Sequence, residues 1–466
     1  MQRPRPLAKS RAQWCQEIPV LQAVSAAIPS YFQPPATAPC STQFLNNCPI
    51  ATTVIDDAAA RLERFRPFLA AAFPETKADA GLIESATIEL PRAQAALCKQ
   101  LDFSVPGRLL LKADHTLPIA GSVKARGGIH EVLAVAEKLA IENGILKPDQ
   151  NTSALHSPEA RNFFATKQIA VGSTGNLGIS IGIIGAALGF QVTVHMAAAA
   201  KEWKKTLLRR HGVTVVEYQG DYGEAVVSGR AEAAQNPHCH FVDDENSLAL
   251  FAGYAVAAQR LQRQLRDMNI VVDADHPLFV YLPCGVGGAP GGITFGLKEV
   301  FGDDVICIFA EPTHSPCMLL GLATGLHDKI SVEDFGLDNL TAADGLAVGR
   351  ASGLVGQAIG PLVSGVFTSE DERLYALLTL LADTENIRME PSALAGLTCL
   401  AHPETKTFLQ QFSKRNLATS THLIWGTGGA LVPQQEMDKY YQQGKNLLND
   451  ATRVKKLFPS ATILSR

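Results

Sequence analysis

The sequence predicts an α/β protein with two open, mainly parallel, twisted sheets flanked by helices. Short apolar strands alternate with helices between residues 168 and 242, and the same alternation returns between residues 278 and 425. Three turns rich in glycine and small residues follow strand ends, at 172–178, 284–292 and 426–429. Ligands bind beyond the carboxyl ends of parallel strands, so these turns predict a site where the two structural units meet.

The individual elements follow from the spacing of apolar residues. Apolar residues near the helical period indicate helices, and short continuous apolar runs indicate buried strands. The first part of the chain has expected helices at 58–72 and 129–142 and a strand at 109–112. The first alternating stretch has strands at 168–171, 191–195, 213–217 and 241–242, with helices at 179–188, 201–211 and 222–234. The second has strands at 278–282, 305–310 and 422–425, with helices at 293–301, 373–385, 391–400 and 406–412.

On this basis the chain divides into a discontinuous large unit and a small inserted unit. The expected parts are an N-terminal accessory segment at 1–55, a large domain at 56–164 and 246–445, a small α/β domain at 165–245, and a C-terminal tail at 446–466. The turn at 173–176 and the glycine-rich turn at 284–292 lie in different units. We therefore expect the active site between the domains and closure of the domains over a bound ligand.

The composition is that of a compact globular enzyme. The chain has 466 residues, of which 46% are hydrophobic and 18% charged. Its 41 basic and 45 acidic residues give a net charge of −4, so neither nucleic acid nor a membrane is an expected partner. Nine scattered cysteines without a C-x-x-C pair argue against a disulfide framework and favour a cytoplasmic location. The sequence leaves open a monomer or a small homo-oligomer.

A lysine in a turn of small residues is the first candidate catalytic group. Lys124 lies in the stretch 118–128, after the expected strand at 109–112 and before a helix. Its glycine and alanine neighbours leave room for a ligand close to the backbone. An ordinary surface lysine is the alternative. We expect Lys124 to form a Schiff base with an aldehyde cofactor, because a neutral lysine amine attacks carbonyl groups.

The three turns at strand ends offer complementary groups for a ligand. The turn at 284–292 has five glycines in nine residues before a helix, which predicts a phosphate cradle, with a tightly packed turn as the alternative. The turn at 173–176 carries hydroxyl and amide groups that either bind a carboxylate or cap the following helix. Thr427 places one hydroxyl between glycines at the last strand end.

Four motifs in combination resemble the fold-type-II pyridoxal-phosphate enzymes. They are Gly-Ser-Val-Lys-Ala-Arg-Gly-Gly at 121–128, Ser-Thr-Gly-Asn-Leu-Gly at 173–178, Cys-Gly-Val-Gly-Gly-x-Pro-Gly-Gly at 284–292 and Thr-Gly-Gly at 427–429. Longer runs, at 310–321 and 339–353 among others, resemble more closely the bacterial D-serine dehydratase family. The resemblance covers about residues 55–440, and Ala289 departs from it because the family has a glycine there. It implies the tryptophan-synthase-β-like fold.

The resemblance also implies a role for each residue of the site. Lys124 would hold pyridoxal 5′-phosphate as a Schiff base and remove the Cα proton of the substrate. Asn176 would face the ring hydroxyl, and Thr427 the pyridine nitrogen. The phosphate would lie on Gly285, Gly287, Gly288 and the peptide of Ala289, and the substrate carboxylate on Ser173, Thr174 and Gly175. The implied reaction converts D-serine to pyruvate and ammonia, with D-threonine as a further candidate substrate.

Two acidic motifs have two interpretations each, and one run of possible metal ligands is also present. Asp243, with its neighbour Asp244, follows a strand and either places the substrate or caps a turn. Glu311 is either a ligand of a monovalent cation such as K⁺, as the resemblance implies, or part of a structural pairing. The run His238-Cys239-His240 is not expected to bind a metal, because adjacent side chains on an extended segment diverge.

Two rival functions stay open at this point. One is another β-eliminase of the same fold, such as a threonine dehydratase. The other is a non-catalytic nucleotide-binding α/β protein that uses the glycine-rich turns for a dinucleotide. Turnover of D-serine and visible absorbance from a Schiff base at Lys124 separate these interpretations.

Overall fold

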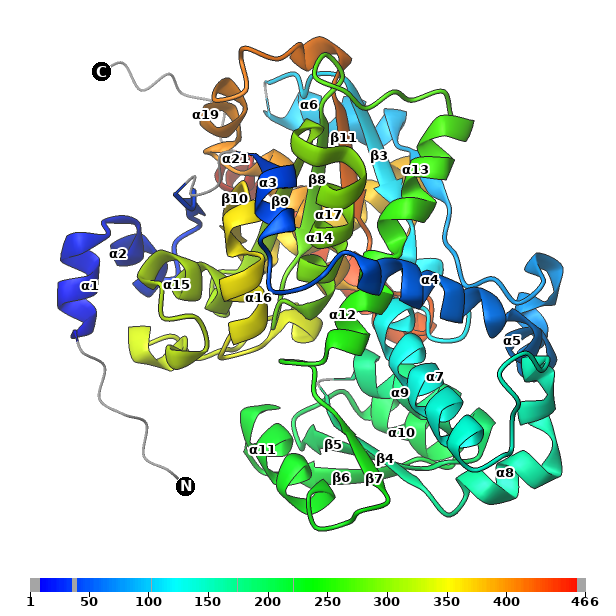
Figure 1. Ribbon diagram of the computed structural model, residues 1–466. Helices are drawn as coiled ribbons and strands as arrows, with labels where there is room; N and C mark the ends of the chain where they lie inside the picture. The colour runs from blue at the N-terminus through cyan, green and yellow to red at the C-terminus, as the bar shows by residue number, and fades with distance from the viewer. Residues whose placement is uncertain (1–8, 36–39, 102, 174, 221, 459–466) are drawn as a thin grey trace.

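The protein contains two mainly parallel sheets, one in the upper and one in the lower half of Figure 1. The computed structural model describes residues 9–35, 40–101, 103–173, 175–220 and 222–458. The large sheet has the order β1 (Tyr31–Phe32), β10 (Gly365–Ser369), β9 (Val305–Pro312), β8 (Leu278–Pro283), β11 (Thr421–Trp425), β3 (Arg108–Lys112) and β2 (Thr87–Glu89). Its five central strands are parallel, and the edge strands β1 and β2 are antiparallel. These arrangements confirm the predicted fold class.

The small sheet is parallel throughout. Its order is β6 (Thr214–Tyr218), β5 (Gln191–Ala197), β4 (Gln168–Gly172) and β7 (Cys239–Val242). The helices around it include α8 (Pro158–Phe164), α9 (Asn176–Leu188), α10 (Glu202–Arg210) and α11 (Tyr222–Ala233). The long helix α7 (Lys124–Glu142) packs against α9 and against α12 (Leu248–Ala255). It therefore connects the two sheets, and the domain boundaries drawn from the sequence stay predictions.

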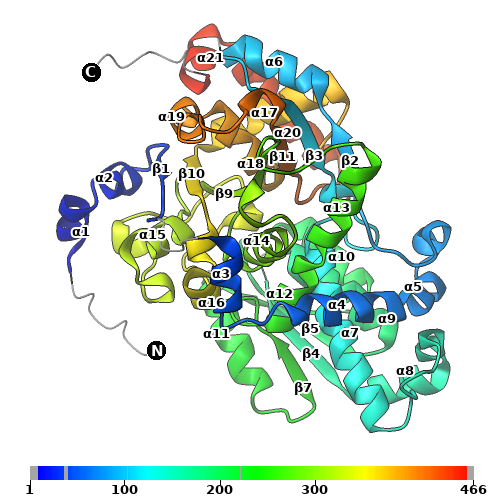
Figure 2. The ribbon, with the colours of Figure 1, turned by 45° about the horizontal axis from the view of Figure 1, so that its top comes forward.

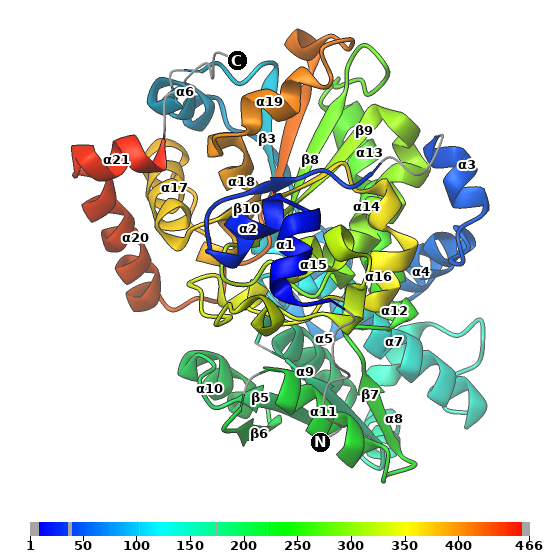
Figure 3. The same ribbon diagram turned by 90° about the vertical axis from the view of Figure 1, so that its left-hand side faces the viewer.

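The large sheet separates two apolar cores, because its central strands are covered on both faces. In β8, Leu278, Val280 and Leu282 face one core, and Phe279 and Tyr281 face the other. Figures 2 and 3 show the helices of the two faces. One face carries α12, α13 (Ala257–Asp267) and α14 (Gly288–Phe301), and the other α6 (Pro91–Leu101), α17 (Asp371–Glu385), α18 (Ala395–Thr398) and α20 (Gln434–Leu448).

The remaining helices lie around these layers. They are α1 (Arg11–Glu17), α2 (Val20–Ser25), α3 (Ser41–Asn46), α4 (Thr53–Arg64), α5 (Arg66–Ala72), α15 (Cys317–Thr324), α16 (Gly353–Ala358), α19 (Thr405–Gln410) and α21 (Ala451–Leu457). Within the part of the chain that the structure describes, no helix is both long and apolar enough to cross a membrane.

Several boundaries differ from the prediction. The expected helix at 58–72 is two helices that meet at Phe65, and the expected helix at 391–400 is α18 between short 3₁₀ turns. Helix α14 begins at Gly288, so the second half of the glycine-rich turn is helical. The N-terminal segment supplies β1, which pairs with β10 and covers that edge of the large sheet.

Candidate active site

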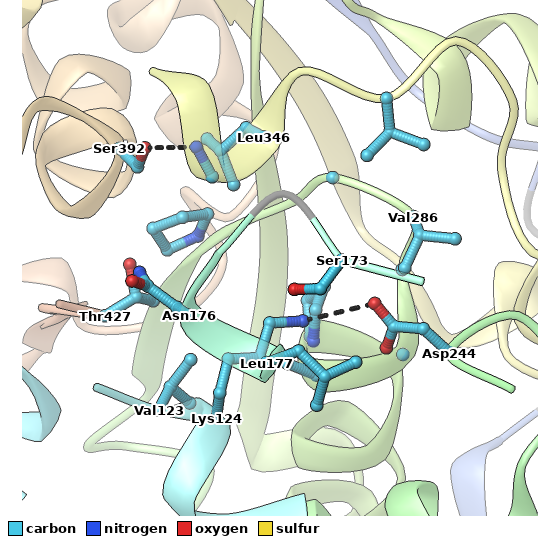
Figure 4. A pocket seen from close by; sticks show the side chains of 18 of the residues that line it. Val123, Lys124, Ser173, Asn176, Leu177, Asp244, Val286, Leu346, Ser392 and Thr427 are labelled. Atoms are coloured by element: carbon cyan, nitrogen blue, oxygen red, sulfur yellow. Dashed lines mark hydrogen bonds and ion pairs between the residues drawn. The ribbon is translucent and has the colours of Figure 1, made fainter. Parts of the chain in front are cut away.

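The predicted turns meet at one cavity between the two sheets (Figure 4). Its walls include Lys124, Ser173, Asn176, Thr427 and the glycine-rich stretch 285–290, and the cavity with its mouth encloses about 650 Å³. The residues come from the ends of β4, β8 and β11 and from the start of α7. This is the edge where parallel strands present their carboxyl ends, which is where α/β sheets bind ligands.

Lys124 is the first residue of α7, and its side chain points into the cavity. Its Nζ lies 3.6 Å from Asp244 Oδ2 and 5.8 Å from the centre of the Tyr254 ring. The N–H of Val123 donates to the carbonyl oxygen of Thr427 at 2.7 Å, so the lysine turn and the last strand end are fixed to each other. The lysine amine thus lies beside an acid, in a largely buried position.

Polar atoms without partners surround this lysine. Asp244 Oδ1, Ser122 Oγ and the Tyr254 hydroxyl are buried and find no hydrogen-bond partner among the described residues. Buried polar atoms are normally paired. Of these three residues Asp244 lines the cavity, so its unpaired oxygen is placed to accept a hydrogen bond from a ligand there.

The turn between β8 and α14 suits a phosphate. Gly287 has φ +112°, a conformation that favours glycine, and a methyl group there would lie 2.4 Å from Met318 Cε. The N–H groups in the first turn of α14, Gly288 and Ala289 among them, have no partners within the helix and lie at its positive end. The glycines of this turn and Ala289 line the cavity, and their role as a phosphate cradle stays a prediction.

The turn after β4 uses its serine to begin a helix. Ser173 Oγ accepts hydrogen bonds from the N–H groups of Gly175 and Gly178, both at 2.9 Å, so the capping alternative describes its acceptor role. The side chain of Ser173 also lines the cavity. Asn176 Nδ2 donates to Glu390 Oε1 at 2.6 Å. Thr174, predicted to bind the substrate carboxylate, lies outside the described residues.

The structure favours Asp244 over Asp243 as the acid of the site. Asp243 accepts hydrogen bonds from Arg230 at 3.0 Å and from Asn246 at 3.2 Å, and it does not line the cavity. Asp244 lines the cavity and faces Lys124 (Figure 4). Strand β7 ends at Val242 and the chain turns at 243–246, so only one of the two neighbouring carboxylates enters the cavity.

Glu390 is a cavity residue that the sequence did not indicate. It is 4% exposed, and a methyl group on Gly428 would lie 2.4 Å from its Oε1. Burial raises the pKa of Glu390, against the lowering effects of Lys204 and of the Asn176 hydrogen bond. The only sequence signal for Glu390 is that it is an acidic residue before Pro391. Acidic residues are common at the start of a helix, so this signal does not predict that Glu390 lines the cavity.

The two remaining predictions concern ions. Glu311 accepts the N–H groups of Met318 at 2.7 Å and Leu319 at 2.9 Å, and burial raises its pKa to about 8 despite these bonds. Its carboxylate thus caps α15, which is a structural pairing. His240 contacts Glu131, and His238 contacts Lys167. No group of three metal-binding side chains occurs among the described residues.

A buried charge network holds the start of α7. Arg126 donates to both oxygens of Asp114 at 2.7 Å and also to Glu84, and the Trp425 indole donates to Asp114 at 2.7 Å. Burial alone would raise the pKa of Glu84, but Arg126 and Lys112 outweigh it and hold that pKa well below its usual value. Asp114 therefore links the helix that carries Lys124 to the strand that precedes Thr427.

A family model described as pyridoxal-phosphate dependent enzyme matches residues 89–410 of this sequence. The chain belongs to this family, and the cofactor of the family fits the glycine cradle, the lysine and the unpaired polar atoms described above. The solved structure of diaminopropionate ammonia lyase from Escherichia coli is similar in fold, with a TM-score of 0.66 at 16% identity over 90% of this chain and 97% of that one.

Within the family, the chain is similar in sequence to D-serine dehydratases. A probable D-serine dehydratase of Chromobacterium violaceum is 55% identical over 94% of this chain and 99% of its own length. A D-serine dehydratase of Escherichia coli is 58% identical over 84% of this chain and 89% of its own length.

Proposed function

We propose that the protein eliminates the β-hydroxyl group of D-serine to give pyruvate and ammonia. One observation supports this most strongly. The side chain of Lys124 points into a cavity that is also lined by the glycine-rich stretch 285–290, which suits an anion, and by Ser173 of the turn that suits a carboxylate. The names of the similar proteins support the choice of substrate. Turnover of D-serine, D-threonine, L-serine and L-threonine tests it, because a threonine dehydratase would prefer threonine and a nucleotide-binding protein would convert none of them.

Each residue of the cavity has a definite task in this proposal. Pyridoxal phosphate, when bound at Lys124, withdraws the electron pair that remains after Cα loses its proton. Lys124 is the group that takes this proton, and Asp244 holds positive charge next to it. The α14 N-terminus and Gly285, Gly287, Gly288 and Ala289 bind the phosphate.

The substrate is oriented by the turn after β4. We assign its carboxylate to Ser173, Thr174 and Gly175, because the positive end of the α9 dipole favours an anion there. Asn176 is assigned to the ring hydroxyl, and its bond to Glu390 fixes the orientation of its amide. With the carboxylate held on one side, the Cα–H bond is directed toward the base, and this orientation lowers the barrier.

Thr427→Asp is expected to shift the products from pyruvate toward transamination. A threonine hydroxyl is uncharged, whereas an aspartate carboxylate stabilises a protonated pyridine nitrogen and so holds the electron pair on the ring for longer. The ratio of pyruvate to the pyridoxamine form of the cofactor measures this partition. Thr427→Ser keeps the hydroxyl and is the matched control. An Asp variant with the partition of wild type would contradict the role assigned to Thr427.

A monovalent cation and the further substrate belong to the same proposal. Glu311 remains the candidate ligand of K⁺, and D-threonine remains a second candidate substrate. We expect turnover of D-serine to fall several-fold when potassium chloride is replaced by tetramethylammonium chloride at equal ionic strength. Equal rates in the two salts would assign Glu311 to the capping of α15 alone. The monomer or small homo-oligomer and the four-part division of the chain are likewise proposed.

A further inference from the structure

We infer that Lys204 is a positioning residue that joins the carboxylate-binding turn of the small sheet to the large sheet, and this inference rests on the proposed function. Lys204 belongs to α10, a helix of the small sheet, and its side chain is 1% exposed. Its partners Asp344 and Glu390 belong to loops that cover the large sheet. The charged side chain of Lys204 thus reaches from the small-sheet unit to the large-sheet unit, beside the cavity that lies between them.

The side chain of Lys204 packs against the backbone of the turn at 173–176. A methyl group on Gly175 would lie 2.2 Å from Lys204 Cδ and 3.0 Å from its Nζ, so the backbone of Gly175 rests directly on the lysine side chain. Gly175 has φ +145°, and only a glycine combines this conformation with such a close approach. The position of the turn that is assigned to the substrate carboxylate therefore depends on the position of Lys204.

The ammonium group of Lys204 then fixes the turn to the large sheet. Nζ donates to Asp344 Oδ2 at 3.0 Å, and Gly345, the next residue, donates its N–H to Ser392 Oγ at 3.0 Å. Gly345, Ser392 and Glu390 all line the cavity. The ion pair between Lys204 and Asp344 thus connects the turn assigned to the substrate carboxylate to the opposite wall of the same cavity.

The charges in this cluster keep the lysine ionised. Burial would lower the pKa of Lys204, but the charges of Asp344 and Glu390 outweigh it, so the pKa lies above its ordinary value. Glu390 in turn accepts the hydrogen bond of Asn176, the first residue of α9. Removing the charge of Lys204 therefore leaves the buried Glu390 and the partly buried Asp344 without their cation, which favours separation of the two walls.

A second contact follows the same boundary. Lys201, at the N-cap of α10, places its Nζ 5.8 Å from the centre of the Tyr440 ring in α20. The acids Asp344, Glu436 and Glu390 raise the pKa of Tyr440 in addition to its burial, so this ring borders the same cluster. The beginning of α10 thus contacts elements of the large-sheet unit at two points, through Lys204 and through Lys201.

The neighbouring lysine provides a matched control. Lys205 is also on α10 and is 2% exposed, but its Nζ contacts Ala198 and Glu217, both within the small sheet and its connections. Lys204→Met and Lys205→Met each remove one buried charge and keep an unbranched side chain of similar length. A purely stabilising role predicts similar consequences for both, whereas the positioning role predicts an effect on substrate binding for Lys204 alone.

The experiment compares wild type, Lys204→Met, Lys204→Arg and Lys205→Met, each loaded with pyridoxal phosphate. We expect KM for D-serine to rise about 10- to 100-fold in Lys204→Met, with partial recovery in Lys204→Arg and little change in Lys205→Met. The visible absorbance of the bound cofactor should persist in all four, because the cradle and Lys124 are intact. Hydrogen exchange without substrate should increase at 344–348 and 389–394 in Lys204→Met only.

The outcomes separate this inference from the proposed function. Equal KM values for the two Met variants, or exchange at 344–348 and 389–394 that does not differ between them, would overturn the positioning role. If wild type converts another amino acid instead of D-serine while the exchange difference is present, the proposed substrate is wrong and the connection through Lys204 stands.

Discussion

Lys124→Ala is expected to lower pyruvate formation by about 10⁴-fold or more and to remove the visible absorbance of the Schiff base. Alanine removes the amine that anchors the cofactor and the base that accepts the Cα proton. The glycine cradle and the N-terminus of α14 remain, so pyridoxal phosphate still binds without a covalent bond. Absorbance, cofactor content after desalting and pyruvate formation are measured on the same sample.

A second lysine of the same helix is the control. Lys138 lies on α7 with a side chain that is 73% exposed, so Lys138→Ala should match wild type in absorbance and rate. A Lys124→Ala enzyme that keeps the absorbance, or that forms pyruvate within tenfold of the wild-type rate, would contradict both roles given to Lys124.

Asp244→Asn is expected to lower the rate with D-serine about 100-fold. The carboxylate lies 3.6 Å from Lys124 Nζ, and its second oxygen is buried without a partner among the described residues. Asparagine keeps the shape of the side chain and removes its negative charge. A positive charge on the Lys124 amine then loses the neighbouring carboxylate that stabilises it. The rate at saturating D-serine is the measurement.

Asp243→Asn is the comparison that tests the choice between the two acids. Asp243 is paired with Arg230 and does not line the cavity, so this variant should lose much less activity. Thermal unfolding of both variants shows whether the rates reflect the site or the fold. A larger loss in Asp243→Asn than in Asp244→Asn would contradict the placement of Asp244 in the site.

The elements that the sequence predicted best are those specified by local pattern. Strands β4, β8 and β11 are short apolar runs followed by small residues, and this pattern alone locates their carboxyl ends. Lys124 and Thr427 follow from the same pattern, because each lies in a turn next to an expected strand or helix. Motif and structural context agree at these positions.

Contacts between distant segments explain what the sequence did not reveal. Lys204, Asp344 and Glu390 come together only through the fold, and no local pattern distinguishes them from other charged residues. The early start of α14 has a similar cause. Its glycines disfavour a helix locally, but a methyl group on Gly292 would lie 2.5 Å from the Phe251 carbonyl oxygen, so close packing requires glycine there.

The most direct test of the account is pyruvate formation from D-serine by the purified protein loaded with pyridoxal phosphate. We expect equal amounts of pyruvate and ammonia, and a rate with D-serine above the rates with L-serine and with either enantiomer of threonine. A protein that binds the cofactor at Lys124 but releases no pyruvate from D-serine would contradict it.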